Sequence, residues 1–270
     1  MAEADKVFAG SIPAIYERLL VPMIFEPYAR DIAARVAGLK PASVLELAAG
    51  TGAVTRAMDR VLGPDVQITA TDLNQPLLDM AMAQQKNGTR ITWQQADAMS
   101  LPFAEQSFDV LVCQFGVMFF PDKLQSYREA LRVLRVGGTY IFAVWDKVAN
   151  NDFIAVVNRA LASEFPADPP LFMERMPHGY HDLDQIGTTV KGAGFSAVTL
   201  ETVDHKSVAN SALDAATAYC QGNPLGGEIE ARAPGRLEDV THHVARTLRH
   251  EFGDGVIDGR IRAHIVTAAR

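Results

Sequence analysis

The sequence contains very little cysteine, and this scarcity limits the chemistry available to the chain. Its 270 residues include two cysteines, Cys113 and Cys220, which lie far apart and form no CxxC motif. A disulfide-stapled secreted scaffold and a paired-thiol redox motif are therefore excluded. Free thiols are typical of a reducing compartment, so we expect a cytoplasmic protein.

Long apolar runs are also missing. The longest, around residues 110–120, is too short for a membrane-spanning helix. The opening residues, MAEADKVFAG, carry acidic side chains and lack an apolar core, which a signal peptide requires. We therefore expect neither a membrane span nor a signal peptide.

Basic residues are outnumbered by acidic ones. The chain has 25 Lys and Arg against 32 Asp and Glu, a net charge of −7, and no strong basic cluster, so nucleic acid is not an expected partner. The histidines are scattered. The adjacent pair His242-His243 would point about 100° apart on a helix and could not share one metal ion. We predict no metal site.

Apolar runs of strand length alternate with helical periodicity through the middle of the chain. Five runs are predicted to be strands: residues 44–48, 66–71, 91–95, 108–115 and 139–145. Further strands are predicted at 197–203 and 259–270. This alternation, with short connections, predicts an α/β fold with a doubly wound, Rossmann-like, seven-stranded and mostly parallel sheet.

Glycines and acidic residues follow the ends of these predicted strands. Gly50 and Gly52 follow the first strand, Asp72 ends the second, and Asp97 follows the third. In a doubly wound sheet the ligand lies at the carboxyl ends of the strands. Asp72 comes 20 positions after Gly52, the spacing at which an acid binds both ribose hydroxyls. The alternative for Asp72 is a helix cap, for which Asn74 is better placed.

The glycine turn discriminates between two kinds of nucleotide cofactor. A dinucleotide site requires G-x-G-x-x-G, but Gly50-Thr51-Gly52 continues as Ala53-Val54-Thr55 without the third glycine. Glu46, beside the turn, repels a pyrophosphate and suits a cationic amino group, which it would serve through water or adjacent backbone. A phosphate-free nucleoside with an amino-acid tail is S-adenosylmethionine, whose product is S-adenosylhomocysteine. A nicotinamide-dependent oxidoreductase and a non-catalytic cofactor-binding protein remain as alternatives.

Four ordered motifs resemble those of class I S-adenosylmethionine-dependent methyltransferases. "VLELAAGTGAVT" resembles their first motif and "ATDLN" their acidic second motif. "QADAMSLPFAEQSFDVLVCQFGVMFFPD" and "EALRVLRVGGTYIFAVW" resemble the branch that includes the ubiquinone and menaquinone C-methyltransferases. The resemblance covers about residues 40–146, is highly specific for the cofactor and is poorly specific for the substrate.

The resemblance implies a set of cofactor contacts. Gly50 and Gly52 would pass close to the methionine part, and Asp72 would hold the ribose. The adenine would contact Leu73, Asp97 and the Ala98 backbone, and Phe115 would border the sulfonium. One residue departs from the family pattern: Ala48 stands where the family has its first glycine. Because alanine prefers negative φ, a slightly displaced turn is expected.

The remaining segments are expected to build the substrate side. We predict N-terminal helices at 1–40 that cover the site, a cofactor-binding α/β core at 41–207, a helical cap insertion at 208–252 that acts as a lid, and a final core strand at 253–270. The N-terminal segment is predicted to form two short helices with Pro22 between them. In the C-terminal insertion, residues 222–227 are predicted to form a turn between two helical stretches.

Three residues outside the core are candidates for the chemistry of methyl transfer. Tyr16 and Tyr28 could line the substrate site. His178, in the loop after the fifth strand, is the candidate general base, which only an acidic O–H or C–H nucleophile requires. The expected activity is in-line methyl transfer to a small, lipophilic acceptor. The sequence leaves open the acceptor, the methylated atom and the oligomeric state.

Overall fold

The computed structural model describes residues 12–85 and 90–270. This part of the chain divides into two compact units. The first, which we call the helical unit, holds the described residues up to Pro27 together with Asp146–Gly179 and Asp204–Arg262. The second, the sheet unit, comprises Tyr28–Trp145, Tyr180–Val203 and Ala263–Arg270.

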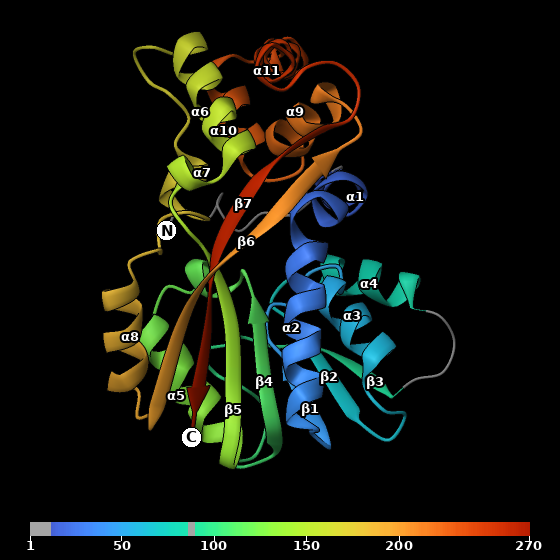
Figure 1. The fold of residues 1–270 in the computed structure, drawn as a ribbon, viewed down its shortest axis with the longest axis vertical. Coiled ribbons are helices and arrows are strands. Elements are labelled where there is room, and N and C mark those ends of the chain that lie inside the picture. Colours follow the sequence, from blue (N-terminus) through green and yellow to red (C-terminus); the bar gives the residue numbers. More distant parts are fainter. Residues whose placement is uncertain (1–11, 86–89) are drawn as a thin grey trace. The chain divides into compact units, whose positions relative to one another are not determined.

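The sheet unit follows the alternation read from the sequence (Figure 1). Its strands are β1 (Ser43–Glu46), β2 (Gln67–Asp72), β3 (Ile91–Gln95), β4 (Phe108–Gln114) and β5 (Leu134–Trp145). Two longer strands, β6 (Ala197–Ala209) and β7 (Ile257–Ala269), contribute residues to both units. Its helices are α2 (Glu26–Leu39), whose first residues belong to the helical unit, α3 (Ala53–Val61), α4 (Gln75–Gln84), the 3-10 helix η3 (Val117–Phe119), α5 (Lys123–Val133) and α8 (Leu183–Gly192).

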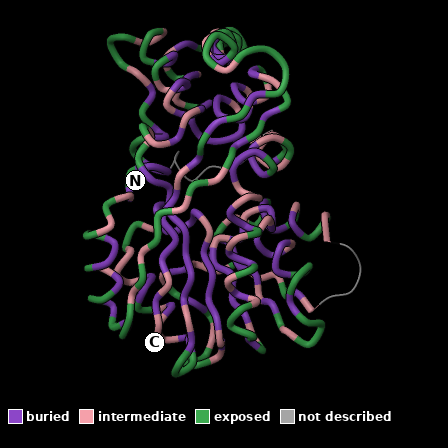
Figure 2. Tube along the Cα trace, in the orientation of Figure 1, coloured by how far each residue is buried: buried purple, intermediate pink, exposed green. Residues whose placement is uncertain are grey.

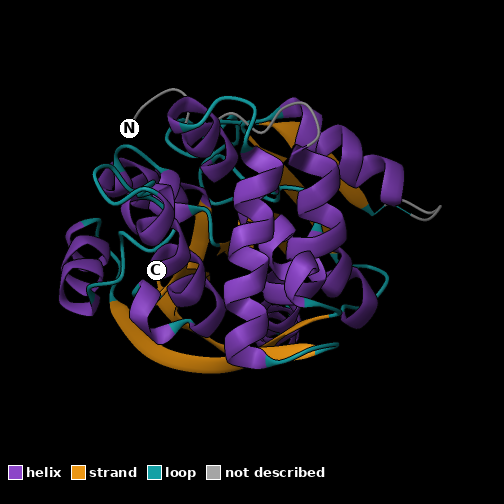
Figure 3. Ribbon diagram, turned by 90° about the horizontal axis from the view of Figure 1, so that it is seen from above, coloured by secondary structure: helices purple, strands orange, loops and turns teal. Residues whose placement is uncertain are grey.

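The seven strands form one sheet in the order β3-β2-β1-β4-β5-β7-β6. Neighbouring strands from β3 to β5 run parallel, and β7 runs antiparallel to β5. The order reverses between β1 and β4, so right-handed crossovers place α3 and α4 on one face of the sheet and α5 on the other. Figure 3 shows these helices in purple and the strands in orange. The predicted doubly wound, mostly parallel sheet is confirmed.

The central strands are buried because their sequences are apolar on both faces. β4 reads FDVLVCQ and is buried along most of its length, as is the end of β5, and Figure 2 shows these strands in purple. A parallel sheet covered by helices on both faces requires such continuous apolar runs. The carboxyl ends of β1, β2 and β4 are therefore held in a rigid core.

Two strands are longer than their sequence patterns predicted. β5 begins at Leu134 rather than at 139, because Leu134 pairs with Phe108 and a register shift follows before Val110 pairs with Thr139. Gly137, with φ +79°, lies in this irregular stretch. β6 continues beyond 203 to Ala209, where alternating exposed residues gave a weaker pattern.

The N-terminal helices of the helical unit correct one expectation. α1 (Ile12–Ile15) runs directly into a π-helix, η2 (Tyr16–Phe25), and Pro22 lies inside η2 instead of separating two helices. The wide i→i+5 turn, seen where the Glu26 N–H donates to the Val21 carbonyl, accommodates the proline. The proline thus marks a change of helix type.

The other helices of this unit come from two stretches of the chain. They are the 3-10 helix η4 (Val148–Asn150), α6 (Asp152–Glu164), α7 (Phe172–Arg175), α9 (Ala212–Gln221), α10 (Leu225–Arg232) and α11 (Leu237–Phe252). α11 packs on both α6 and α9. Residues 146–179 therefore group with residues 204–262, which include the predicted cap insertion, whereas the sequence pattern predicts them in the core at 41–207.

The predicted turn at 222–227 is only partly a turn. Leu225 begins α10, and Gly226 lies inside that helix. A Cβ on Gly226 would lie 2.8 Å from the Cys220 carbonyl oxygen, so this glycine serves a close backbone approach rather than a turn. Among residues 12–85 and 90–270, each helix is too short or too polar to traverse a lipid bilayer.

Candidate functional site

The turn after β1, residues 48–52, lies between the ends of β2 and β4. Glu46, the last residue of β1, pairs with Ala70 on one side and with Val112 on the other. Beyond it, the Leu47 N–H donates to the Val112 carbonyl and the Ala49 N–H donates to that of Thr71, each at 2.8 Å. The strand ends named by the sequence therefore meet at one edge of the sheet.

Ala48 adopts the backbone conformation that a glycine would take at this position. Its φ is +53°, in the left-handed region that alanine disfavours by about 1 kcal/mol. Its methyl group contacts the loop after β4: a Cβ added to Gly116 would lie only 2.5 Å from the Ala48 Cβ. The alanine is accommodated because Gly116 has no side chain.

Gly52 is required by the chain itself. Its φ is +85°, and an added Cβ would lie 2.9 Å from Cη2 of Trp93 and 3.3 Å from the Cβ of Ala81. Gly52 is the N-cap residue of α3. Packing against β3 and α4 thus requires a glycine here, and the close approach of a ligand that the sequence suggests remains a prediction.

The Asp72 carboxylate joins the first turn to the second. It is 6 % exposed, and its Oδ2 accepts the Gly50 N–H at 2.8 Å. Its Oδ1 accepts the backbone N–H of Asn74 at 2.8 Å and the Asn74 side-chain amide at 3.3 Å. Burial raises the pKa of Asp72, and the N–H groups of Asn74 and Gly50 act in the opposite direction. Asn74 is the N-cap residue of α4, but its side chain bonds Asp72 rather than capping the helix.

The residues expected around an adenine lie at the ends of β2 and β3. Leu73 is 49 % exposed, unusually for a leucine next to a buried strand, and its carbonyl accepts from the Gln95 side chain. Asp97 Oδ1 accepts the Met99 N–H at 2.9 Å, and Ala98 is buried. The β2–β3 pairing of Asp72 with Gln95 brings these two strand ends together.

Glu46 is buried and bonded within the chain. Its Oε2 accepts the hydroxyl of Thr55, on α3, at 2.5 Å, and it is 2 % exposed. Burial raises the pKa of Glu46 to about 8, while the Thr55 hydroxyl and the Arg56 guanidinium act in the opposite direction. The carboxyl group is therefore mostly protonated at neutral pH and holds α3 to the end of β1.

Phe115 follows β4 with φ +55° and belongs to an aromatic cluster. Its ring stacks on Trp145 with centroids 3.7 Å apart, and Tyr28 lies edge-on to both rings. Tyr28 has no exposed surface, and its hydroxyl donates to the Val203 carbonyl at 2.8 Å. These contacts correct the expectation that Tyr28 lines the substrate site, because its whole side chain lies in the core of the sheet unit.

The helical unit holds His178 and Tyr16. His178 is 5 % exposed, and its Nδ1 lies 2.6 Å from the Asp146 carbonyl oxygen, which can only accept a hydrogen bond. A neutral ring would therefore carry its proton on Nδ1, with Nε2 as the acceptor. Tyr16 is half-buried in η2, with its ring 5.0 Å from that of Phe25.

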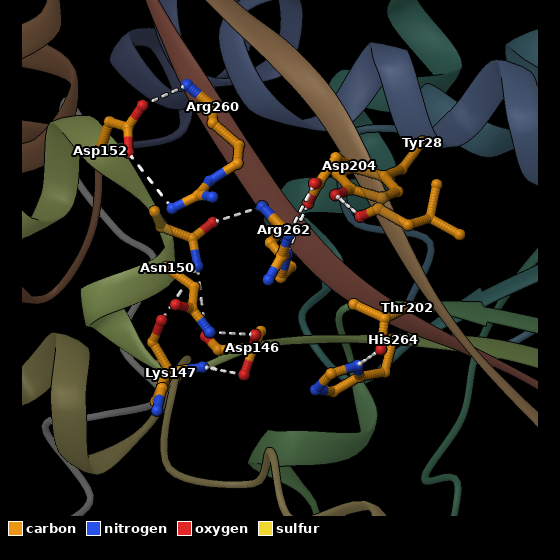
Figure 4. A network of polar contacts seen from close by, with 12 residues as sticks. Tyr28, Asp146, Lys147, Asn150, Asp152, Thr202, Asp204, Arg260, Arg262 and His264 are labelled. Carbon is orange, nitrogen blue, oxygen red and sulfur yellow. Dashed lines mark hydrogen bonds and ion pairs between the residues drawn. The ribbon is translucent and has the colours of Figure 1, made fainter.

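A polar network fixes the backbone that His178 contacts (Figure 4). The Asp146 N–H donates to the Arg262 carbonyl, and the Asp146 carboxylate accepts from the Lys147 N–H and the Asn150 side chain. Asn151 accepts the Arg262 N–H at 2.8 Å. The Asp146 carbonyl is thereby held in one orientation toward His178.

Thr51 was missed as a candidate by sequence reasoning. It lies between the two glycines of the turn and is 1 % exposed, and its hydroxyl has no hydrogen-bond partner among the described residues. A buried hydroxyl without a protein partner is costly, so its place in the turn makes Thr51 a candidate cofactor contact. Its position inside Gly-Thr-Gly was the signal available in the sequence.

The strand order and the strand-end turn define the class I methyltransferase type of α/β fold. The profile of the ubiE/COQ5 methyltransferase family matches residues 17–158, more than half of the chain and all of the strand ends described above. The chain belongs to the ubiE/COQ5 methyltransferase family.

Curated relatives agree with this family over part of their length. A ubiquinone/menaquinone biosynthesis C-methyltransferase from Hahella chejuensis is 38 % identical over 112 residues, 40 % of this chain and 45 % of the relative. The enzyme of that name from Ectopseudomonas mendocina is 27 % identical over 208 residues, 72 % of this chain and 76 % of the relative. The chain thus spans less than half the length of the first of these relatives.

Solved structures show the same fold. The phosphoethanolamine N-methyltransferase 2 of Haemonchus contortus, in complex with phosphomonomethylethanolamine and S-adenosylhomocysteine, superposes with a TM-score of 0.64. It is 16 % identical and covers 98 % of this chain and 59 % of that one. S-adenosylmethionine is the cofactor of this class. Among the described residues, no group of three His, Cys, Asp or Glu side chains could hold a metal ion.

Proposed function

We propose that this protein transfers the methyl group of S-adenosylmethionine to a small, quinone-type acceptor. The observation that carries the proposal is the family match over residues 17–158, which spans the strand ends. The names of the Hahella chejuensis and Ectopseudomonas mendocina relatives support a ubiquinone- or menaquinone-type ring as the acceptor and carbon as the methylated atom.

The residues present fit this cofactor. We assign the ribose hydroxyls to the buried carboxylate of Asp72 and the adenine to the exposed face of Leu73, with Asp97 and the Ala98 backbone at its amino edge. The buried Thr51 hydroxyl and the turn at 48–52, with Gly50 and Gly52, would hold the amino-acid tail. Phe115 would border the sulfonium. When bound, S-adenosylmethionine supplies an electrophilic methyl group on a sulfonium centre.

The chain itself contributes alignment, exclusion of water and one proton acceptor. Methyl transfer requires the acceptor atom, methyl carbon and sulfur in line, which the rigid strand ends favour. A ring carbon that gains a methyl group must lose a proton, and we assign this proton to Nε2 of His178, whose Nδ1–H is held by Asp146. Tyr16 remains our proposed acceptor contact.

The two buried free thiols, Cys113 and Cys220, support a reducing, cytoplasmic location, which a disulfide in freshly isolated protein would contradict.

Calorimetry and a methylation assay test the proposal together. We expect S-adenosylhomocysteine to bind and NADH not to bind. Asp72→Asn should weaken binding by roughly ten- to a hundredfold, because a charged acceptor is lost. Asp65→Asn, which removes the same charge at an exposed position before β2, should bind like the parent.

The methylation assay uses reduced naphthoquinones that lack the ring methyl group, with mass detection of the methylated product. His178→Asn should lower turnover without altering the affinity for S-adenosylhomocysteine; unchanged turnover would remove His178 from the mechanism. Tight cofactor binding without product across a broad acceptor panel would instead favour a non-catalytic protein.

A further inference from the structure

The segment between β4 and α5, residues 115–122, carries Phe115 and has an irregular backbone. It leaves the strand at Phe115, where φ is +55°, and turns at Gly116 into the 3-10 helix η3. Gly116 is in close contact with the turn after β1, as its approach to the Ala48 methyl group shows. Besides its packing on Trp145 and Tyr28, the position of Phe115 thus depends on what holds this short loop.

Lys123, the first residue of α5, holds the loop from its far end. Its Nζ donates to the carbonyl oxygens of Phe120 at 3.0 Å and of Met118 at 3.3 Å. A helix end leaves such carbonyls without helical partners, and they attract a cation. Lys123 is therefore a side-chain clamp on the end of η3.

The ammonium group of Lys123 also faces an aromatic ring. Nζ lies 4.8 Å from the centroid of the Tyr180 ring, and the Tyr180 hydroxyl lies 3.3 Å from that of Tyr127. Tyr127 is one turn along α5 from Lys123, and Tyr180 lies just before α8, which contacts α5. The cation thus connects the loop after β4 to the segment that enters α8.

Partial burial makes this cation costly for the fold. Burial lowers the pKa of Lys123. Nζ donates to two backbone carbonyls, which compensate a charge less fully than a carboxylate does. An apolar side chain such as methionine could cover the same ring and carbon atoms. What it could not supply is the pair of directed hydrogen bonds to the loop.

We infer that Lys123 is a positioning residue: by clamping the Met118 and Phe120 carbonyls, it fixes residues 115–120 and places Phe115 at the cofactor's edge. The inference rests on the proposed function only for the identity of the cofactor. The placement of Phe115 can be measured without it, because Phe115 stacks on Trp145 at 3.7 Å.

The chain has two tryptophans, which provide a local probe and its control. With 5-fluorotryptophan incorporated, the Trp145 resonance reports on Phe115, whereas Trp93 contacts Gln85 and lies beside Gly52. The variants are Lys123→Met, which keeps the stem and removes the cation, and Lys123→Arg, which restores donors. Arg128→Met removes an exposed cation from the same helix.

We expect Lys123→Met to shift the Trp145 resonance and not that of Trp93, Lys123→Arg to return it toward the parent position, and Arg128→Met to leave both unchanged. An unmoved Trp145 resonance in Lys123→Met would overturn the inference whatever happens to the thermal midpoint. So would a shift of both resonances, which indicates general loosening, or an arginine variant shifted as far as the methionine variant.

Affinity for S-adenosylhomocysteine tests the link to function. We expect about a tenfold loss in Lys123→Met, recovered in Lys123→Arg, from the loss of charged hydrogen bonds that hold the loop. A shifted Trp145 with unchanged affinity would refute placement for the cofactor. If the parent protein fails to bind S-adenosylhomocysteine, the proposed function fails, while the fluorine spectra still decide whether Lys123 positions Phe115.

Discussion

Ala48 and Phe115 are non-glycine residues with φ of +53° and +55°, and each lies just beyond a strand. Backbone in this region costs of order 1–3 kcal/mol for a side-chain-bearing residue and persists only where the surroundings enforce it. Here Gly116, Trp145 and Tyr28 supply the enforcing contacts. Two of the four described non-glycine residues with positive φ thus lie at the edge of the sheet to which we assign the cofactor, while Lys40 and Gln106 precede β1 and β4.

Single residues were predicted from the sequence where their position on a strand decided their role. The place of Asp72 at the end of β2 could be predicted because acids there follow a fixed spacing from the glycine turn, and its role at the ribose remains a prediction. Tyr28 was wrongly assigned, because burial by Phe115, Trp145 and the Val203 carbonyl depends on residues far away in the sequence. Such long-range contacts leave no local pattern.

At the same scale, Glu46 makes stability depend on pH. Its pKa is about 8 in the folded chain against an ordinary value of 4.5. Between these two pH values the folded state therefore binds one proton more than the unfolded state. The contribution of protonated Glu46 to the free energy of unfolding is fully present below pH 4.5. It is lost as the pH rises toward about 8, by up to about 1.4 kcal/mol per pH unit.

Urea unfolding of the parent and of Glu46→Gln from pH 5 to 8 checks this prediction, since the amide keeps an acceptor for Thr55 and cannot ionise. As the pH rises from 5 to 8, the free energy of unfolding of the parent should fall relative to that of Glu46→Gln. Parallel pH profiles would show that Glu46 titrates normally.

The elements were predicted well where a buried apolar run is flanked by turn residues, and less well elsewhere. β3 matches its predicted bounds, and β2 ends only one residue beyond its predicted end at 71. The start of β5 at Leu134, before Gly137-Gly138, could not be predicted from the local sequence, because it depends on pairing with β4. Pro22 misled for a similar reason: a π-helix tolerates it, and helical periodicity does not distinguish helix types.

The start of α3 provides a test at this scale. Gly52→Ala should cost about 2–4 kcal/mol of stability, because an alanine is strained at φ +85° and its methyl group would overlap Trp93. Gly63→Ala, just beyond α3, should change stability by less than about 0.5 kcal/mol, since nothing lies within 4 Å of the added methyl. Thermal unfolding followed by tryptophan fluorescence measures both; equal effects would contradict the packing argument.

On the scale of the whole molecule, the two units divide the chain differently from its sequence order. The helical unit draws on three separate stretches, because α6 packs against α11 although they lie far apart in the sequence. Sequence reasoning placed 146–179 in the core since it follows β5 without a break. Only the tertiary contacts of α6 reveal where that segment belongs.

If cofactor binding resides in the sheet unit, damage to the helical unit should leave it intact. Leu248→Ala on α11 removes a fully buried side chain and should destabilise by about 2–5 kcal/mol. We expect its affinity for S-adenosylhomocysteine, measured below the unfolding temperature, to stay within about twofold of the parent's. Ile186→Ala on α8 is the matched core truncation in the sheet unit. A large loss of affinity in Leu248→Ala without one in Ile186→Ala would contradict the placement of cofactor binding in the sheet unit.

The shared strand β7 has a consequence for how the protein is made. Residues 263–269 of β7 pair with the apolar end of β5, and its earlier residues belong to the helical unit. A ribosome that synthesises the chain must therefore expose the unpaired edge of β5 until β7 emerges more than a hundred residues later. We expect the nascent chain to bind a holding chaperone during translation, because both units lack part of their residues until β7 has emerged.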